Sequence, residues 1–452
     1  MQSDIATMTT LDLFSTVTYN QPDETNRKVL PPISAPKILV VGSNTDYIEL
    51  LRHSNPGHAV FLTAQAERNK QMDTTIEEWE ELSWDLEDDG ENILQALKDH
   101  ISSWKSSFGG IVCYDCDSLE LAAFLAEKLQ LPYPSTKSIR HCRDKNITKK
   151  LWRQNGLPCP RHRKVTSAEE VFHFWQEIEG PCVLKPLAGS GSDLVFLCTN
   201  RKECDKSSRI IQEGLQERKA IRLYRKRPVS SFLAEEYIAG EEFSCDFTIR
   251  DRAVEILRLT RKIKFTRKPF GTIDAYMICD WQDAGLQKTI LADILLKAAD
   301  ALGLSNALCM VDFIVNNQQI FLLEMSPRPG GDCIPALLFR ATGFDILSRA
   351  LEFAGNQAPA PISKISGNGL IALRLHAETS GEIVKINTNS LYQDPRTREI
   401  NIVHSAGHLI TMPPDDYDSW YLGYVLFRPV PGIPVEEQCL ELRQMLDLDI
   451  KK

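Results

Sequence analysis

One segment of the sequence constrains the fold more than any other, because two apolar runs that each carry a carboxylate meet in it. Apart from Asp312, Glu324 and the final Ser326, the segment "ALCMVDFIVNNQQIFLLEMS" (307–326) is apolar on both sides of a polar tetrapeptide at 316–319. This pattern predicts a β-hairpin. If residues 317–319 form a three-residue loop, Asn316 pairs with Ile320 and Asp312 lies opposite Glu324. The two carboxylates then share one face of the hairpin.

A bare pair of carboxylates in this position is unfavourable. Two such charges about 4 Å apart repel by roughly 4 kcal/mol at an effective dielectric constant near 20. A cation between Asp312 and Glu324 removes this cost, and oxygen ligands favour Mg²⁺ or Mn²⁺. The alternative is a register in which Asp312 caps a turn or pairs with a surface lysine.

The residues after this hairpin carry more chemistry than a turn needs. "SPRPGGD" (326–332) places Ser326, Arg328, Gly330 and Gly331 directly after the Glu324 strand. A turn requires a glycine or a proline, but it does not require an acid and an arginine at fixed offsets. A guanidinium held in a Pro-Arg-Pro-Gly frame can bind a carboxylate or a phosphate through two hydrogen bonds.

Two further segments combine glycine with charge. "CVLKPLAGSGSD" (182–193) predicts a strand that ends near Lys185 and a loop whose backbone N–H groups can face an anion. It lacks the GxxxxGK[ST] pattern, and a plain hairpin loop is the alternative. "FLAEEYIAGEEFS" (232–244) crowds four glutamates between two predicted strands, which indicates either a solvated acidic edge or a hinge that meets a polar ligand such as an adenine amine and ribose hydroxyls.

The N-terminal third predicts a separate α/β unit. Residues 1–35 are expected to be a loose leader, and strands and helices alternate over 36–135, which predicts a small parallel sheet of Rossmann type. Its first turn, "GSNTD", has a single glycine and therefore lacks the GxGxxG dinucleotide fingerprint. We expect this unit to be structural.

Composition limits the partners. A chain of 452 residues suggests two to four domains, and a formal charge of −9 disfavours nucleic acid or an anionic membrane as the main partner. The two basic stretches, 218–227 and 258–268, are expected to be solvated, with Lys262 or Lys264 as candidate phosphate contacts. No apolar run has membrane-spanning length, and the first residues, "MQSDIATMTTLDLF", are not expected to be a secretory signal because they lack a basic region and an apolar region. The twelve cysteines are scattered through apolar or strand-like segments, so we expect reduced, mostly buried thiols, no zinc and a cytoplasmic protein.

In combination these motifs carry a resemblance. The succession "DKNITKKLWRQNGLPCP", "CVLKPLAGSGS", "FLAEEYIAGEEFS", "VDFIV" and "FLLEMSPRPGG" resembles the ATP-grasp superfamily of carboxylate ligases over about residues 36–360. The resemblance implies an α/β ATP-grasp fold that follows a Rossmann-like domain at 36–135. The ATP-grasp domain is expected at 136–360, its lid subdomain at about 165–250, and a β-rich C-terminal domain at 361–452.

The resemblance also implies roles for individual residues. It implies that ATP and Mg²⁺ (or Mn²⁺) lie between the lid and the hairpin. The implied ATP contacts are Lys145, Lys185, the loop residues Gly189, Ser190, Gly191 and Ser192, the adenine hinge Glu235, Glu236, Tyr237 and Ile238, and the ribose ligand Glu242. The implied metal ligands are Asp312, Glu324 and Ser326, where the family usually has Asn in place of Ser326. This shorter side chain is expected either to offer its own oxygen or to hold a water.

The C-terminal segments distinguish the branches of the superfamily. "LRLHAETSGEI" (373–383) is similar to an element of biotin carboxylases, whereas 422–446 and "PRPGGD" resemble the L-amino-acid ligases. The substrate-side residues are then Arg328, Gly330, Gly331, Arg374 and His376, with surface strand positions as the alternative for the last two.

The resemblance implies an ATP-dependent ligase that converts a small-molecule carboxylate into an acyl phosphate and couples it to an amine, with Arg328 and Lys185 as catalytic residues. It is compatible with a homodimer. Two alternatives stay open. One is carboxylation through carboxyphosphate, as in biotin carboxylases, and the other is a regulatory nucleotide-binding protein without catalysis.

Overall fold

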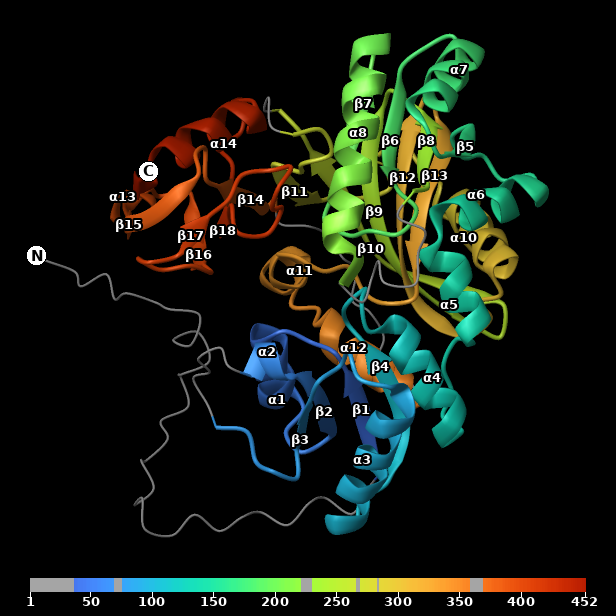
Figure 1. The fold of residues 1–452 in the computed structure, drawn as a ribbon. Helices are drawn as coiled ribbons and strands as arrows, with labels where there is room; N and C mark the ends of the chain where they lie inside the picture. Colours follow the sequence, from blue (N-terminus) through green and yellow to red (C-terminus); the bar gives the residue numbers. More distant parts are fainter. Residues whose placement is uncertain (1–35, 69–74, 221–229, 266–268, 283, 358–368) are drawn as a thin grey trace, which may run out of the picture.

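The N-terminal unit is a parallel sheet covered by helices. The computed structural model describes residues 36–68, 75–220, 230–265, 269–282, 284–357 and 369–452, so the predicted leader 1–35 lies outside it. The four strands are in the order β3-β2-β1-β4 and all pairs are parallel (Figure 1). The elements are β1 (Lys37–Val41), α1 (Thr45–Ser54), β2 (Ala59–Ala64), α2 (Gln65–Arg68), β3 (Glu81–Trp84), α3 (Gly90–Ser103), β4 (Phe108–Cys113) and α4 (Leu119–Leu129). The predicted parallel sheet is confirmed; sequence analysis missed β3, whose four residues are only partly buried.

A second, antiparallel sheet forms a small lobe, which we call the lid. Its strand order is β5-β8-β6-β7, and the helices α7 and α8 pack on it. The elements are β5 (His162–Val165), α7 (Ala168–Ile178), β6 (Cys182–Pro186), β7 (Phe196–Cys198), α8 (Arg201–Glu217), η1 (Arg218–Ala220) and β8 (Phe232–Glu236). The predicted strand, glycine loop and strand over 182–198 are confirmed by β6 and β7. The lid sheet ends at Glu236, because the next strand, β9, pairs in the large sheet.

The large sheet has eight strands and continues into the C-terminal region. Its order is β13-β12-β9-β10-β11-β14-β18-β16, with antiparallel pairing throughout (Figure 1). The strands are β9 (Glu241–Arg250), β10 (Ala253–Ile263), β11 (Ala275–Ile278), β12 (Ala307–Asn316), β13 (Gln319–Ser326), β14 (Ile371–His376), β16 (Thr397–Ile402) and β18 (Tyr421–Phe427). The associated helices are α5 (Thr136–Arg143), α6 (Lys145–Gln154), α10 (Lys288–Leu302), α11 (Ile334–Thr342) and α12 (Ile346–Ala354). The last of these packs against β4 and so joins the sheet to the N-terminal unit.

The β12–β13 hairpin confirms one prediction and corrects another. Asp312 pairs with Glu324, as expected, but Asn316 pairs with Gln319 rather than with Ile320. The loop therefore has two residues, Asn317 and Gln318, both with positive φ as a tight hairpin turn requires. A β-bulge between Asp312 and Phe313 on one strand, with Leu323 as the extra residue on the other, restores the expected alignment.

The C-terminal residues add a smaller sheet of the order β17-β15-β19. Its elements and neighbours are β15 (Gly381–Asn387), α13 (Asn389–Gln393), β17 (Leu409–Ile410), α14 (Val435–Gln444) and β19 (Asp447–Lys451). The last helix, α14, ends at Gln444, and Asp447 opens the strand β19. None of the described helices combines the length and the apolar character that a membrane span requires.

Candidate active site

One large cleft, of about 870 Å³, lies between the lid and the large sheet. Every residue that the sequence singled out as a site residue lines this cleft, from Lys145 on α6 to His376 on β14. The glycine loop after β6 and the segment after β13 both line it. The structure thus brings together residues separated by more than two hundred positions in the chain.

The floor of the cleft is a row of charges on β9, β10 and β12. Backbone pairing places Glu242 beside Lys262, and Lys262 Nζ lies 2.9 Å from Glu242 Oε1 and 2.5 Å from Asp312 Oδ2. Lys264 forms a second ion pair with Glu242. Burial raises the pKa of Glu242, but the two lysines outweigh it and lower that pKa to about 2. Burial likewise lowers the pKa of Lys262, and the carboxylates of Asp312 and Glu242 overcome this and raise it. Glu242 is therefore an anion and Lys262 a cation at neutral pH.

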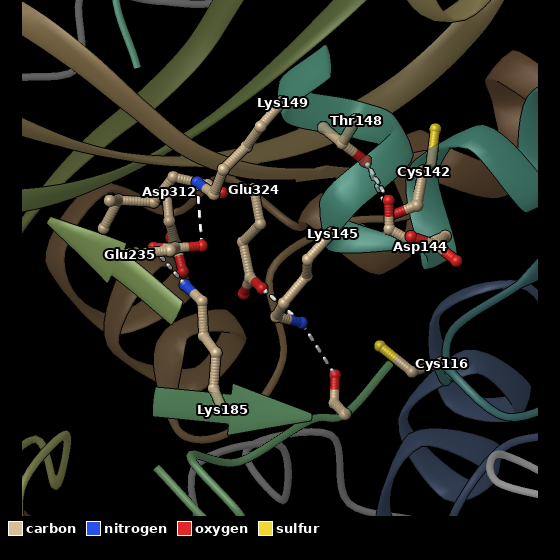
Figure 2. Close-up of polar contacts among 12 residues, drawn as sticks. Cys116, Cys142, Asp144, Lys145, Thr148, Lys149, Lys185, Glu235, Asp312 and Glu324 are labelled. Atoms are coloured by element: carbon tan, nitrogen blue, oxygen red, sulfur yellow. Dashed lines mark hydrogen bonds and ion pairs between the residues drawn. The ribbon is translucent and has the colours of Figure 1, made fainter. Parts of the chain in front are cut away.

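Glu324 and Lys145 connect the hairpin to the glycine loop. Lys145 is the first residue of α6, whose N-cap Asp144 accepts hydrogen bonds from two backbone N–H groups. Its ammonium lies 3.0 Å from Glu324 Oε2 and donates to the Gly189 carbonyl at 3.4 Å (Figure 2). Burial raises the pKa of Glu324, but Lys145, Lys185 and Lys262 together hold it well below its usual range. Glu324 is therefore an anion that faces the cleft.

The residues present fit a hard divalent cation. Asp312 is buried, and its pKa is raised by burial and by the charge of Glu324 although Lys262 opposes the shift. Within the described part of the chain, Asp312 Oδ1 and Ser326 Oγ have no hydrogen-bond partner although both atoms are buried. Oxygen atoms of this kind are the ligands that Mg²⁺ and Mn²⁺ prefer. The alternative in which Asp312 pairs with a lysine also has a counterpart, but Lys262 is buried and engages only Oδ2.

The lid is joined to the hairpin by a buried cluster that sequence analysis only half identified. Glu235 on β8 lies 2.8 Å from Lys185 Nζ and 3.2 Å from Lys149 Nζ (Figure 2). Lys149 also donates to the carbonyl of Leu323, the bulged residue, at 2.8 Å. Burial raises the pKa of Glu235, and the two lysines lower it below the ordinary value. The Glu235 carboxylate therefore holds the ammonium groups of Lys149 and Lys185 in position.

The other hinge residues differ from Glu235. Arg161 forms two hydrogen bonds, each 3.1 Å long, with the carboxylate of Glu236, at the rim. Tyr237 is exposed, and its ring makes a T-shaped contact with the ring of Phe270, with 6.2 Å between the ring centroids. Tyr237 and Ile238 line the cleft just before the chain enters β9. Their position fits a hinge that borders a flat ring system.

The glycine loop is fixed at one point and open at its tip. Ser192 donates a hydrogen bond of 2.8 Å to the Gly271 carbonyl. Gly191 has a φ of +62° and no neighbouring atom within 4 Å of the position that a Cβ would occupy. Gly189, Ser190 and Gly191 therefore present backbone to the cleft, as an anion-binding loop requires.

Arg328 is held by the segment around it. Its Nε donates to the Cys116 sulfur at 3.1 Å and its Nη1 donates to the Pro329 carbonyl at 2.7 Å. Cys116 belongs to the N-terminal unit, in the loop after β4, and also lines the cleft. The guanidinium is thus positioned between the unit at 36–135 and the hairpin.

Gly330 has a packing reason of its own. A Cβ at this position would lie 2.1 Å from Arg258 Nη2, and the Gly330 N–H donates to Asp246 Oδ1 at 3.0 Å. Arg258 and Asp246 form a fully buried pair, with Nε to Oδ2 at 2.7 Å. Gly330 therefore lets the chain cross this pair closely.

Arg374 and His376 both line the cleft rather than the surface. Arg374 Nε lies 2.7 Å from Asp332 Oδ2, which also accepts from the Tyr276 hydroxyl at 3.2 Å. His376 is buried beside Trp420, with 4.5 Å between the ring centroids. This end of the cleft is thus aromatic and carries a charged pair.

Sequence reasoning missed Lys149, the Arg258–Asp246 pair and Asp332, and treated Lys262 and Lys264 as minor candidates. Lys149 lies on an amphipathic helix, where a lysine normally marks the solvent side. Its burial and its ion pair with Glu235 become visible only in the folded structure. The spacing of Arg258, Thr260 and Lys262, which places them on one face of a strand, is the sequence signal that could have found Lys262.

The lid, the large antiparallel sheet and the cleft between them define an α/β protein with two lobes on either side of a charged cleft. Residues 178–336 match the family model described as the ATP-grasp domain, so this part of the chain is an ATP-grasp domain. The structure superposes on the L-amino acid ligase from Bacillus licheniformis with a TM-score of 0.76 at 18% identity, covering 93% of this chain and 100% of that one. A biotin carboxylase from Campylobacter jejuni gives a TM-score of 0.62 at 16% identity, covering 92% and 93%. The predicted fold is confirmed.

The relatives found by sequence match a smaller part of the chain than the structural neighbours do. The uncharacterized protein y4rH of Sinorhizobium fredii is 25% identical over 260 residues, which are 57% of this chain and 51% of that protein. A D-alanine--D-alanine ligase of Acidovorax ebreus is 24% identical over 247 residues, 51% of this chain and 70% of the ligase. The chain thus spans about half the length of the first of these relatives.

Proposed function

We propose that this protein is an ATP-dependent ligase that joins a carboxylate to an amine and releases ADP and phosphate. The observation that carries the proposal is the meeting of Asp312, Glu324 and Ser326 with Lys145 and Lys185 in one cleft, beside Arg328. The named relatives support the proposal, because an L-amino acid ligase and a D-alanine--D-alanine ligase are among them.

The lysines and the glycine loop would bind the phosphates of ATP. Lys145 reaches the cleft from α6 and Lys185 from the lid strand β6, and the open tip at Gly191 adds backbone N–H groups. Glu242 would accept from the ribose hydroxyls, and the hinge at 235–238 would border the adenine. Phosphoryl transfer depends mainly on positioning and on charge stabilisation, which this set of groups provides.

Asp312, Glu324 and Ser326 would hold Mg²⁺ or Mn²⁺, which supplies charge neutralisation to the phosphates when bound. Arg328 would bind the substrate carboxylate and stabilise the charge that develops on it as the acyl phosphate forms and as the amine attacks. The lid would keep water from this intermediate. Small-molecule carboxylates and amines are thus the partners that we propose.

The proposal is tested by a screen of phosphate release over a matrix of carboxylates and amines, with the product mass measured. Phosphate release that requires both a carboxylate and an amine supports ligation. The product mass should then equal the sum of the carboxylic acid and the amine minus one water molecule. Release that depends on bicarbonate and a biotinyl acceptor would favour carboxylation instead. Tight ATP binding without any turnover across the matrix would favour a regulatory role.

A further inference from the structure

Three cysteines from separate elements meet inside the lid. The sulfur atoms of Cys182, Cys198 and Cys204 all lie within 4.8 Å of one another, and the three side chains are fully buried. Cys182 on β6 and Cys198 on β7 are cross-strand partners, and Cys204 lies in the first turn of α8. In the described part of the chain, this is the one group of three or more His, Cys, Asp or Glu side chains with such spacing. None of the three lines the cleft.

We propose that Cys182, Cys198 and Cys204 form a binding site for a thiophilic cation, Zn²⁺ or Cu⁺, inside the lid. Thiolates select both ions. Zinc–sulfur bonds of about 2.3 Å in tetrahedral geometry place neighbouring sulfurs about 3.8 Å apart, so the cluster needs to contract by no more than about 1 Å. Binding forms three metal–sulfur bonds and releases the thiol protons to solvent.

Cu⁺ accepts three sulfurs, whereas tetrahedral Zn²⁺ takes a fourth ligand. Ser207, one turn after Cys204 on α8, is buried next to the Cys198 side chain, and it is the residue that we propose for this fourth position.

The bound cation would stabilise the frame of the glycine loop. Cys182 precedes Lys185 on β6, and Cys198 ends β7, the strand on which the chain returns from the loop. A metal that joins both strands to α8 restrains the loop at its two ends. The lid would then unfold at a higher temperature when loaded, whether or not the protein is a ligase.

The test measures metal directly on the full-length chain. Protein stripped with a chelator is incubated with Zn²⁺ or Cu⁺, passed through a desalting column and analysed by inductively coupled plasma mass spectrometry. We expect one tightly held ion per chain in the wild type and its loss in Cys204→Ser. Cys439→Ser, which alters a buried thiol of the C-terminal core, is the matched control and should retain the ion.

A second measurement on the wild type covers the case in which Cys204→Ser does not fold. Co²⁺ added to stripped protein should give a thiolate-to-cobalt charge-transfer band, and X-ray absorption of the metal-loaded chain should show three sulfur neighbours. Retention of equal metal by wild type and Cys204→Ser, or a cobalt spectrum without sulfur ligation, would overturn the proposal. So would wild type that retains neither ion. The three thiols would then be core packing only.

Discussion

The ammonium of Lys149 lies 3.2 Å from the carboxylate of Glu235, and both side chains are almost fully withdrawn from solvent. Because Lys149 also donates to the Leu323 carbonyl, a single cation holds the lid strand β8 against the hairpin that carries Asp312 and Glu324. The ion pair therefore connects the lid to the β12–β13 hairpin on the two sides of the cleft. Burial lowers the pKa of Lys149 and Glu235 opposes that shift, which makes the two charges interdependent.

Replacing Lys149 with Met should destabilise the protein strongly. Glu235 would keep Lys185 but lose its second cation in a buried position, and breaking a buried pair in this way costs about 3–5 kcal/mol. The free energy of unfolding, measured in urea, checks the prediction. The double variant Lys149→Met/Glu235→Gln should recover part of this loss, because it leaves no uncompensated carboxylate. Equal stability of wild type and Lys149→Met would show that the pair does not hold the lid.

Lys185→Ala should reduce phosphate release about 100-fold or more while leaving the fold intact, since Lys185 lines the cleft, whereas the fully buried Lys149 still bonds both Glu235 and the Leu323 carbonyl. Circular dichroism and the rate of ADP formation are the measurements. Lys164→Ala, at an exposed position on β5 of the same sheet, is the control and should have the wild-type rate. ADP formation that is undiminished in Lys185→Ala would refute the assignment of the glycine loop as the phosphate site.

Arg328→Ala should lower kcat/KM for the carboxylate by about 100- to 1,000-fold and leave the affinity for ATP almost unchanged. The reason is that Arg328 lies with Cys116 and Pro329, beyond the hairpin, rather than among the lysines. Isothermal titration with ATP and steady-state kinetics separate the two effects. If ATP affinity falls instead, the arginine serves the nucleotide.

Ser326 is the position at which the metal site differs from the family pattern. Ser326→Ala should raise the Mg²⁺ concentration for half-maximal phosphate release by about 10-fold, because a buried oxygen without another partner is removed. Ser326→Asn restores an oxygen with a longer reach and should return the requirement toward the wild type. An unchanged requirement in Ser326→Ala would mean that Asp312 and Glu324 hold the ion without it.

The acid stability of the protein should depend on Glu242. Its pKa is lowered from 4.5 to about 2 in the folded state, so its contribution is fully present above pH 4.5 and is lost as the pH falls through about 2. A shift of this size corresponds to roughly 3 kcal/mol. Urea unfolding of wild type and Glu242→Gln should therefore show a smaller difference at pH 3 than at pH 6. A difference that stays constant over this range would contradict the low pKa.

The sequence predicted the elements of the site well because each is a local pattern. Strand, glycine loop and strand over 182–198, and a hairpin that aligns Asp312 with Glu324, depend on residues close in the chain. The hairpin loop was wrong by one residue, since a bulge at Leu323 cannot be read from apolar spacing. Asp312 still lies opposite Glu324, because the extra residue Leu323 compensates for a loop that is one residue shorter than predicted.

What the sequence did not reveal depends on distances between elements. Nothing in the sequence distinguishes Lys149 from an ordinary helix residue. The proximity of Cys182, Cys198 and Cys204 is not visible in the sequence either, because their spacing matches no short motif. The twelve cysteines are mostly buried, as predicted, but burial alone does not say which thiols are neighbours. Tertiary packing supplies that information.

The pairing of β11 with β14 has a consequence for protein engineering. Residues 371–427 complete the same sheet that carries the hairpin, so the C-terminal part is not a detachable module. A chain cut at residue 357 would leave β11 as an open edge, with unpaired backbone groups able to recruit other chains. Chimaeras that exchange this region between relatives should keep β14 and β18 with the host sheet, or they will aggregate.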